Sequence, residues 1–358
     1  MDIVNHLEGR LLFAVPKSEL KQSFREQFLF WKKKSFTLIF EEGRLLQATL
    51  DLLNGADIIF KREHRQDIAL CKNLPIALVF LPASDIPTFV GEGRVSLGIT
   101  GRDTVAEYMS SVDKNERKHA GSHKSNVESE AIETKSGCRE IMDLNFGFCK
   151  LQVQVPENGI YKQPSDLIGK NIGTSFVNLT KDYFSRIEND AKHLTEKRVN
   201  VETANASLCT NVIELSGSVE AACALGVADG IVDLVESGET MKAAGLQAID
   251  TVMESTAILI QNFHSSDQQI IDLIISRLQG IIAAQKYVLC QYNIARTNLK
   301  AALKITPGKR AATISPLEDE DWVAVNAMVE KKIIASSMDR LCEIGAEDIF
   351  VIKIQNSR

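Results

Sequence analysis

The residues with the clearest potential for chemistry in this chain lie between Glu220 and Met241. The run 230–235 is apolar except for Asp233, a pattern typical of a buried strand. The small polar turn 236–240 follows, and then a stretch compatible with a helix start. A strand, a tight turn and a helix start place several backbone N–H groups around one point, where they and the helix dipole attract an anion. The segment therefore predicts an anion site, although turns of this kind more often only cap a helix.

Two carboxylates and two hydroxyls supply what a sugar phosphate would need at this turn. An ionised Asp233 inside an apolar strand costs free energy unless it binds a partner. Glu220, near the start of the preceding helix, could bind ribose hydroxyls with it or help to hold magnesium. Ser237 and Thr240 can donate hydrogen bonds to phosphate oxygens, and Gly238 lets the backbone approach closely. These residue types indicate a site for a ribose 5-phosphate.

The bulk properties exclude several classes of protein. The 358 residues are too many for one typical domain, so two or three are expected. The net charge of -6 argues against a general nucleic-acid binder, and no stretch approaches the roughly 18 apolar residues that span a bilayer. The N-terminus lacks the features of a signal peptide, and the seven scattered cysteines fit a reducing compartment. We expect a cytoplasmic protein with no membrane or nucleic-acid partner.

Short apolar runs alternate with amphipathic stretches through the first two thirds of the chain. Strands are expected at 11–15, 76–80, 97–99, 151–155, 171–174, 212–215 and 230–235. Helices are expected between them, for example at 86–92, 180–187 and 219–225. This alternation predicts an α/β core with largely parallel sheets, arranged in two lobes with a cleft between them. The segment 111–139 is dense in charge, Ser and Gly, which predicts a mobile surface loop.

The last third of the chain has a different order of elements. A long amphipathic helix is expected at 267–285, followed by strands at 286–292, 311–316, 322–329 and 349–354. Helices at 296–305 and 336–344 complete a β-α-β-β-α-β order, which is the ferredoxin-like pattern. The segment has no cluster of catalytic residue types, so a regulatory or assembly role is expected.

The spacing within 220–241 also resembles a family signature. The positions that match the ATP phosphoribosyltransferase signature are Glu220, Gly226, Ala228, Ile231, Asp233, Leu234, Ser237, Gly238, Thr240 and Met241. Further segments that resemble the family, in family order, are LLFAVPK, RQDIAL, SDIPTFVGEG, LGITGRD, FGFCKLQVQVP and GTSF. The stretch from KYVLCQYN to GAEDIFVIKI resembles the histidine-binding regulatory domain of the long form. The chain is similar to the long form of this family, particularly to its fungal members.

The resemblance implies a two-lobed, periplasmic-binding-protein-like catalytic core and an ACT-like, ferredoxin-like regulatory domain. The implied first lobe comprises 1–107 and 243–266, and the second lobe 108–242. A connecting helix at 267–285 leads to the regulatory domain at 286–358. The implied reaction condenses ATP with 5-phosphoribosyl diphosphate to phosphoribosyl-ATP and diphosphate, the first step of histidine biosynthesis. The resemblance further implies Mg2+ as cofactor, histidine as inhibitor, and a homo-oligomer between dimer and hexamer.

The resemblance carries site roles over by position. Glu220 and Asp233 would hold the ribose and position the transition state. Phosphoribosyl diphosphate would be bound by Glu236, Ser237, Gly238, Glu239 and Thr240. ATP or diphosphate would be bound by Lys17, Gly43, Arg44, Arg65, Gly101 and Asp103. Thr313 would contact the inhibitor histidine, and no metal ligands are assigned.

One segment departs from the family pattern. Residues 18–42 separate Pro16-Lys17 from Gly43-Arg44, which form one compact turn in the family. Our hypothesis is an unremoved intron in the gene, which sequencing of the mature transcript would decide. An impaired copy or a non-catalytic two-lobed sensor of small molecules is therefore an alternative to the active enzyme. A phosphoribosyltransferase with another acceptor base is a third interpretation.

Overall fold

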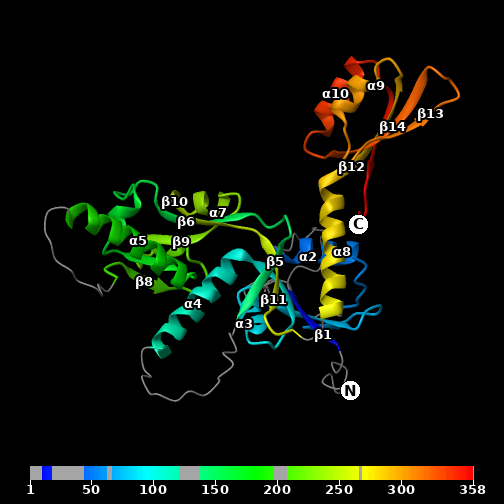
Figure 1. The fold of residues 1–358 in the computed structure, drawn as a ribbon. Coiled ribbons are helices and arrows are strands. Elements are labelled where there is room, and N and C mark those ends of the chain that lie inside the picture. The colour runs from blue at the N-terminus through cyan, green and yellow to red at the C-terminus, as the bar shows by residue number, and fades with distance from the viewer. Residues whose placement is uncertain are drawn as a thin grey trace, which may run out of the picture. The chain divides into compact units, whose positions relative to one another are not determined.

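The computed structural model describes residues 10–17, 44–62, 67–120, 137–196, 208–265 and 268–357. These residues form two compact units (Figure 1). The first unit contains two β-sheets and most of their helices, and the second contains Leu50–Phe60, Lys72–Leu74, a long helix and the C-terminal sheet. Within the described ranges, no helix combines the length and the apolar composition needed to cross a membrane.

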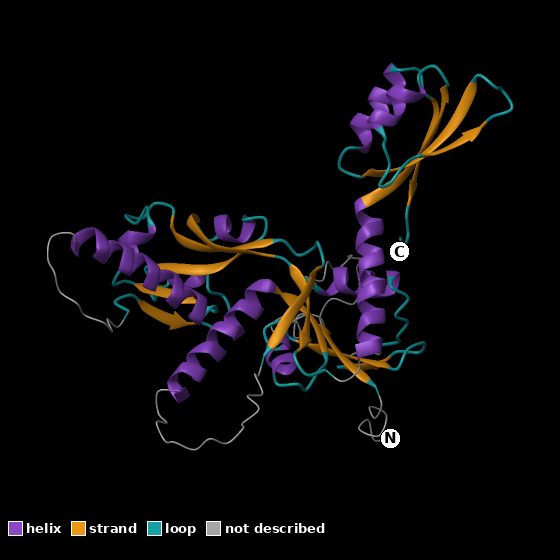
Figure 2. Cartoon of the chain, viewed as in Figure 1, coloured by secondary structure: helices purple, strands orange, loops and turns teal. Residues whose placement is uncertain are grey.

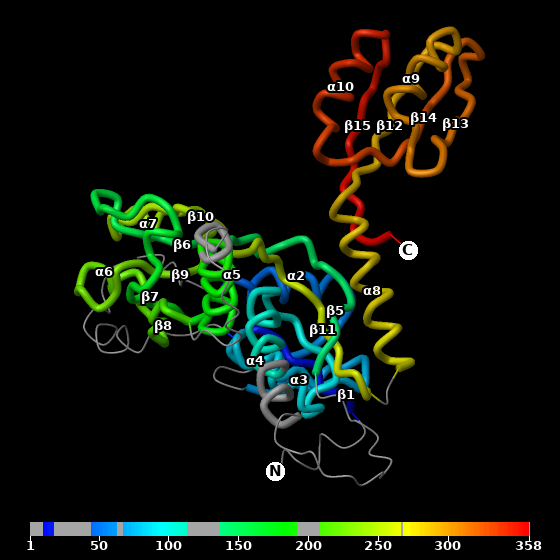
Figure 3. Tube along the Cα trace, turned by 60° about the vertical axis from the view of Figure 1, so that its left-hand side comes forward, coloured from blue at the N-terminus to red at the C-terminus, as the bar shows by residue number. Residues whose placement is uncertain are grey.

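The first sheet has six strands in the order β2-β3-β1-β4-β11-β5. These are β2 (Ile68–Leu70), β3 (Ile76–Leu81), β1 (Leu11–Pro16), β4 (Leu97–Gly101), β11 (Ala257–Asn262) and β5 (Cys138–Asp143). The strands β1, β3 and β4 are parallel, and their apolar side chains are buried on both faces. Helices α3 (Ile86–Gly91) and α4 (Arg102–Ala120) pack on this sheet (Figure 3). Helix α2 (Leu46–Gly55) begins two residues after Arg44. The carboxyl ends of the parallel strands meet at one edge, where ligands bind in open α/β sheets.

The second sheet has five strands in the order β10-β6-β9-β7-β8. These are β10 (Leu246–Ser255), β6 (Cys149–Pro156), β9 (Gly230–Val235), β7 (Asn171–Thr174) and β8 (Asn211–Glu214). Its helices are the 3-10 turn η3 (Pro164–Leu167), α5 (Val177–Glu196), α6 (Ala221–Ala224) and α7 (Glu239–Ala243). One face packs on Phe184 of α5, and the other packs on Val219 and Ala222 beside α6. Because β7, β8 and β9 are parallel, the turn after β9 lies at the ligand edge of this sheet.

The chain passes between the two sheets twice, from β5 to β6 and from β10 to β11. Two α/β sheets joined in this way confirm the predicted two-lobed core. The sheets divide the chain differently from the predicted lobes, however. The strand β5 lies within 108–242 but pairs with β11 in the first sheet, and β10 lies within 243–266 but pairs with β6 in the second. Strand pairing, which the order of elements does not determine, places each of them in the opposite lobe.

Two sequence expectations need correction. The sheets are mixed rather than largely parallel, because β11 is antiparallel to both of its neighbours and β6 is antiparallel to β9 and β10. The predicted mobile loop 111–139 is helical up to Ala120 and enters β5 at Cys138, while 121–136 lie outside the described residues. Val105, Tyr108 and Met109 pack at helical spacing in an apolar cluster. Burial of this face anchors α4, which then extends into the charged segment.

The second unit confirms the predicted β-α-β-β-α-β domain. Helix α8 (Gln268–Lys286) leads into β12 (Tyr287–Ala295), α9 (Leu299–Ile305), β13 (Thr313–Pro316), β14 (Trp322–Glu330), α10 (Ile334–Glu343) and β15 (Glu347–Lys353). The strands form an antiparallel sheet in the order β13-β14-β12-β15, with two helices against one face (Figure 2). Alternate residues of β12 and β14 form its core with Leu341 of α10.

Candidate active site

A pocket of about 350 Å³ opens at the ligand edge of the second sheet. It lies beside the carboxyl end of β9 and the start of α7, where the sequence predicted an anion site. Its lining residues are Arg44, Gln154, Glu220, Asp233, Leu234, Val235, Glu236, Ser237, Gly238, Thr240 and Met241. The pocket therefore brings together the two predicted ribose-binding carboxylates, most of the predicted phosphate loop and one arginine from the first lobe.

Asp233 is a mostly buried carboxylate on β9. Its Oδ1 accepts a hydrogen bond of 2.8 Å from the backbone N–H of Leu234, and no ion pair to it is found among the described residues. The pKa of Asp233 is raised to about 6, mainly by burial; the Leu234 hydrogen bond lowers it, and the neighbouring charge of Glu220 raises it. An acid held in this way gains from any ligand that donates hydrogen bonds to it or brings a cation.

Glu220 stands directly before the short helix α6. Its backbone is already helical (φ −58°), and its side chain makes no capping hydrogen bond to the helix. Glu220 lines the pocket together with Asp233, and its charge acts on the Asp233 carboxyl. Val219 and Ala222, on either side of it, anchor this segment in the core on that face of the sheet.

The turn after β9 has the backbone geometry of an anion loop. Gly238 has φ +79°, a left-handed conformation that favours glycine, and it is the N-cap of α7. Ser237 Oγ accepts a hydrogen bond of 3.4 Å from the backbone N–H of Glu239. The first N–H groups of a helix have no partner within the helix, so those of Thr240 and Met241, which follow Glu239 in α7, are available to an anion in this pocket.

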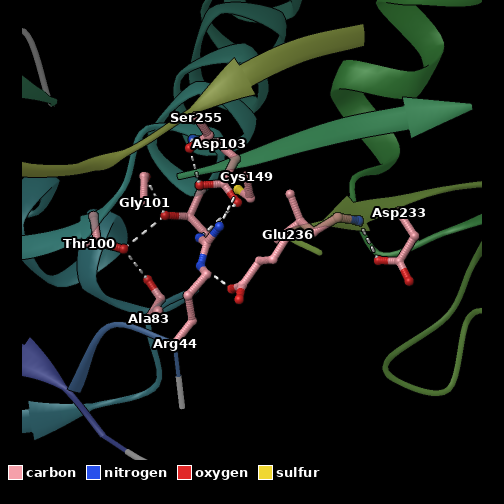
Figure 4. Close-up of polar contacts among 11 residues, drawn as sticks. Arg44, Ala83, Thr100, Gly101, Asp103, Cys149, Asp233, Glu236 and Ser255 are labelled. Carbon is pink, nitrogen blue, oxygen red and sulfur yellow. Dashed lines mark hydrogen bonds and ion pairs between the residues drawn. The ribbon is translucent and has the colours of Figure 1, made fainter. Parts of the chain in front are cut away.

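Arg44 brings a guanidinium from the first lobe to this loop (Figure 4). Its Nε lies 3.4 Å from Glu236 Oε1, and its Nη2 lies 3.5 Å from Asp103 Oδ2. Its Nη1 contacts Cys149 Sγ on β6. Burial raises the pKa of the Cys149 thiol although Arg44 opposes this, so the thiol stays neutral near pH 7. The arginine thus sits between a buried acid of its own lobe and an exposed acid of the phosphate loop.

Asp103 and Gly101 support Arg44 from behind. Asp103 is fully buried. Its Oδ1 accepts a hydrogen bond of 2.7 Å from Ser255 Oγ, and the same Oγ accepts a hydrogen bond of 3.0 Å from the backbone N–H of Asp103. A Cβ on Gly101 would lie 2.0 Å from Asp103 Oδ1 and 3.0 Å from Arg44 Nη2. Neither Gly101 nor Asp103 lines the pocket formed by the described residues. Their position indicates that they hold Arg44 in place.

Lys17 follows β1 at the ligand edge of the first sheet. Its Nζ forms an ion pair of 2.5 Å with Asp67, and its backbone N–H donates to the carbonyl of Leu81. The Arg62 guanidinium lies 3.8 Å from the centre of the Phe80 ring. Burial lowers the pKa of Arg62, and the nearby charge of Asp67 opposes this shift. A second group of cations therefore lies at this edge, with partners other than those of Arg44. The predicted site residues Gly43 and Arg65 and the segment 18–42 lie outside the described residues.

Thr313, the predicted histidine contact, lies in the second unit. It is exposed at the start of β13 and pairs with Asn326 of β14.

Sequence reasoning missed three residues of the core site: Cys149, Gln154 and Ser255. Each lies at a β-strand position whose partner is set by pairing across the sheet or between the lobes. A signal was present for Gln154, because the alternating run LQVQVP places a large amide where a strand usually has an apolar or exposed residue. Nothing in the sequence near Ser255 or Cys149 indicated their contacts with Asp103 and Arg44.

The chain matches the family model for ATP phosphoribosyltransferase (HisG) at residues 82–280 and the model for the HisG C-terminal domain at residues 284–356. It is 50% identical over 359 residues to the ATP phosphoribosyltransferase of Yarrowia lipolytica, with 100% of both chains covered. The chain belongs to the ATP phosphoribosyltransferase family. The ATP phosphoribosyltransferase of Schizosaccharomyces pombe is 47% identical, again with 100% of both chains covered.

A solved structure of the ATP phosphoribosyl transferase (HisG:HisZ) complex from Thermotoga maritima also matches. It has 20% sequence identity and a TM-score of 0.49, covering 76% of this chain and 98% of that chain. The full-length matches to the fungal relatives confirm the predicted activity of an ATP phosphoribosyltransferase, a pentosyltransferase that catalyses the first step of histidine biosynthesis. They also confirm the prediction of the long form, because the C-terminal domain model matches the ferredoxin-like unit.

Proposed function

We propose that the pocket beside Asp233 binds the ribose 5-phosphate half of phosphoribosyl diphosphate during this reaction. The observation that carries the proposal is the pairing of a mostly buried carboxylate with a left-handed glycine turn in one pocket of about 350 Å³. Asp233 and Glu220 accept hydrogen bonds from the ribose hydroxyls. The backbone N–H groups and the hydroxyls of 236–240 bind the 5-phosphate, including those of Ser237, Gly238, Glu239 and Thr240.

The chemistry needs positioning and charge stabilisation more than a protein nucleophile. A ring nitrogen of the adenine in ATP attacks the anomeric carbon, a new N–C bond forms, and the bond to the diphosphate oxygen breaks. Positive charge develops on the sugar ring, and the two carboxylates beside it stabilise that charge. The leaving diphosphate takes the electron pair of the broken bond, and cationic side chains of the first lobe neutralise it.

Arg44 is the first-lobe residue best placed for that role. It lines the pocket, and its guanidinium fork can bind phosphate oxygens in place of Glu236. Lys17, at the ligand edge of the first sheet, contacts the diphosphate or the triphosphate of ATP. Gly43 and Arg65 are assigned to the same role by the family resemblance alone. Gly101 and Asp103 contribute by fixing Arg44.

The donor set of the pocket fits Mg2+ held jointly with the substrate. No group of three or more His, Cys, Asp or Glu side chains suited to a metal occurs in the described residues. Mg2+ is usually bound through one or two carboxylates together with substrate phosphates and water, and Glu220 and Asp233 provide such a pair. The ion would offset charge on the leaving diphosphate.

A pair of variants tests the site. We expect Asp233→Asn to reduce kcat/KM for phosphoribosyl diphosphate by roughly 100-fold or more, because a carboxylate facing the developing positive charge is lost. Asp229→Asn is the matched control, because Asp229 lies just before β9 and bonds Tyr161 Oη and the Asn171 backbone outside the pocket. Unchanged kinetics in Asp233→Asn would mean that the ribose is bound elsewhere.

We further propose that histidine inhibits the enzyme through the C-terminal unit, at a site that includes Thr313. The support is the match to the C-terminal domain model and the exposure of Thr313 on β13. Histidine should inhibit the wild-type reaction, and Thr313→Ala should raise the half-inhibiting concentration without changing kcat. Ser315→Ala, two residues along the same exposed strand, serves as the control. Equal inhibition of both variants and wild type would remove Thr313 from the site.

A homo-oligomer between dimer and hexamer is also part of the proposal. Its support is the apolar surface of β15, where Phe350 is 56% and Ile352 is 49% exposed. Both share the face of the C-terminal sheet that α9 and α10 leave open, because they pair with Gln291 and Leu289 on β12. Sedimentation of the wild type against Phe350→Glu tests this contact, and a wild-type monomer would contradict it. The cytoplasmic location predicted from the sequence stays a prediction.

A further inference from the structure

Gln154 is a buried amide within the substrate pocket. It lies on β6 with only 2% of its surface exposed, and it lines the pocket together with Asp233. In the antiparallel pair of β6 and β9, Gln154 is opposite Ile231 and Gln152 is opposite Asp233. Opposite residues share a face of the sheet, so Gln154 and Asp233 are diagonal neighbours on the face that carries the pocket.

The orientation of this amide is fixed by its one hydrogen bond. Gln154 Nε2 donates to the backbone carbonyl of Asp233 at 3.3 Å. A carbonyl only accepts hydrogen bonds, so the nitrogen must occupy that side and Oε1 must occupy the other. Among the described residues, no hydrogen bond to Gln154 Oε1 is found. The buried side-chain nitrogen and oxygen atoms without a partner in the described residues are Thr49 Oγ1 and Arg277 Nε. Gln154 Oε1 is therefore reached by solvent and is available to a ligand in the pocket that the residue lines.

The chemistry of this acceptor decides what it can recognise. The ionised oxygens of a 5-phosphate ester accept hydrogen bonds, so they repel Oε1. Ribose hydroxyls donate, and an amide oxygen is a good partner for them. Asp233, the diagonal neighbour, is already the proposed acceptor for the sugar, which places Gln154 beside the ribose rather than beside the phosphate turn.

We propose that Gln154 Oε1 accepts a hydrogen bond from a ribose hydroxyl of phosphoribosyl diphosphate and so positions the sugar beside Asp233. This inference rests on the proposed ribose 5-phosphate site. Gln154 therefore binds the sugar, whereas the loop 236–240 binds the phosphate. A purely structural amide would instead affect every ligand of the pocket equally, or none.

Binding of three probes to the full-length enzyme separates these roles. The probes are ribose 5-phosphate, 2-deoxyribose 5-phosphate and inorganic phosphate, titrated calorimetrically. Gln154→Met keeps the side-chain length without the amide, and Gln154→Ala is the second variant if the first fails to fold. Gln152→Met is the matched control, because Gln152 shares the strand and the face but donates to Thr251 Oγ1 at 3.0 Å and does not line the pocket.

We expect Gln154→Met to weaken the binding of ribose 5-phosphate by roughly 3- to 10-fold, which is the effect of one neutral hydrogen bond. The affinity for inorganic phosphate should not change. Loss confined to ribose 5-phosphate assigns the contact to the 2-hydroxyl. Loss for both sugars, together with a fall in kcat/KM for phosphoribosyl diphosphate, whose anomeric oxygen carries the diphosphate, assigns it to the 3-hydroxyl. The kcat/KM for phosphoribosyl diphosphate should fall in parallel in Gln154→Met but not in Gln152→Met.

Two results would overturn the inference alone. These are unchanged sugar binding in Gln154→Met and Gln154→Ala while Asp233→Asn loses it, or an equal loss for sugar phosphates and inorganic phosphate. If Asp233→Asn and Gln154→Met both bind ribose 5-phosphate as the wild type does, the proposed site itself is wrong. The design therefore distinguishes failure of the inference from failure of the site.

Discussion

The Nε of Arg44 lies 3.4 Å from Glu236 Oε1, and this ion pair joins the first lobe to the phosphate loop of the second. The Arg44 side chain is 18% exposed, whereas that of Glu236 is 52% exposed. The acid can therefore move into solvent at little cost, while the arginine stays held by Asp103. In the proposed site, a substrate phosphate, with greater negative charge, would replace Glu236 as the partner of the Arg44 guanidinium.

Arg44 should not be replaceable by lysine. Its guanidinium contacts Asp103, Glu236 and Cys149 in different directions, and a lysine ammonium cannot reproduce this planar fork. We expect Arg44→Lys to lower kcat/KM for phosphoribosyl diphosphate by roughly 10- to 100-fold, with little change in secondary structure. Arg94→Lys, an exposed arginine of the same lobe, should retain wild-type kinetics. Full activity in Arg44→Lys would show that only charge is needed there.

Asp233→Asn should stabilise the substrate-free enzyme as it removes activity. The pKa of Asp233 in the folded protein is about 6, against 3.8 for an ordinary aspartate. Between these values the folded state binds more protons than the unfolded state, so stability falls as pH rises from about 4 to about 6. Well above pH 6 the full cost, on the order of 3 kcal/mol, is present, and asparagine removes it.

The measurement is the thermal midpoint of both proteins at pH 4.5 and pH 8. At pH 8 the thermal midpoint of the variant should exceed that of the wild type. At pH 4.5, where Asp233 of the folded wild type is protonated, most of this difference should disappear. An equal gain at both pH values would attribute the effect to packing rather than to charge. In the wild type, kcat/KM should fall as pH drops below about 6, because the protonated acid no longer accepts two hydrogen bonds.

Local sequence patterns predicted the parts of the fold and the site that depend on neighbours along the chain. β7 and β9 have the bounds expected from apolar runs, and the turn at Gly238 follows from residue type. The C-terminal unit was predictable because its β-α-β-β-α-β order is the signature of one arrangement, although β12 pairs with β14 and β15 rather than with the next strand along the chain.

Contacts between distant strands were not predictable in this way. β5 and β10 pair in the sheets opposite to the predicted ones, because the hydrogen-bond partners of a strand leave no mark on its own sequence. Asp103 and Ser255 are 152 positions apart, and only the return of the chain at the end of β10 brings them together. The role of Asp103 as a support for Arg44, rather than a lining residue, therefore required the structure.

Ser255→Ala should weaken both stability and catalysis. Its hydroxyl is the buried partner of Asp103 Oδ1 at 2.7 Å and accepts the Asp103 backbone N–H. Removing it leaves a fully buried carboxylate with Arg44 at 3.5 Å as its main partner. We expect a loss of about 1 to 3 kcal/mol in the free energy of unfolding, and a several-fold fall in kcat as Arg44 shifts.

Urea unfolding and steady-state kinetics check both parts of the Ser255 prediction. Thr251→Ala, on the same strand, removes a hydroxyl that bonds Gln152 and is the control for loss of a strand hydroxyl. A stability loss with unchanged kcat would show that Asp103 does not need Ser255 to hold Arg44.

Gly238 and Gly245 provide a matched test of the phosphate loop. Both have left-handed backbones, with φ +79° and +69°, and they lie on either side of α7. A Cβ would meet atoms no nearer than 3.7 Å at Gly238 and nothing within 4 Å at Gly245. Alanine at either position therefore costs only the conformational strain, about 1 kcal/mol. Only Gly238, however, lines the pocket.

We expect Gly238→Ala and Gly245→Ala to lower the thermal midpoint by similar amounts. Only Gly238→Ala should weaken the binding of inorganic phosphate and raise KM for phosphoribosyl diphosphate, each by roughly 10-fold. The reason is that relaxation of residue 238 toward negative φ turns the backbone N–H groups of the loop away from the anion. Calorimetric titration with phosphate and initial-rate kinetics on both variants check this. Equal phosphate affinity in the two variants would mean that the backbone conformation at Gly238 serves the fold alone, and that the phosphate is bound by side chains.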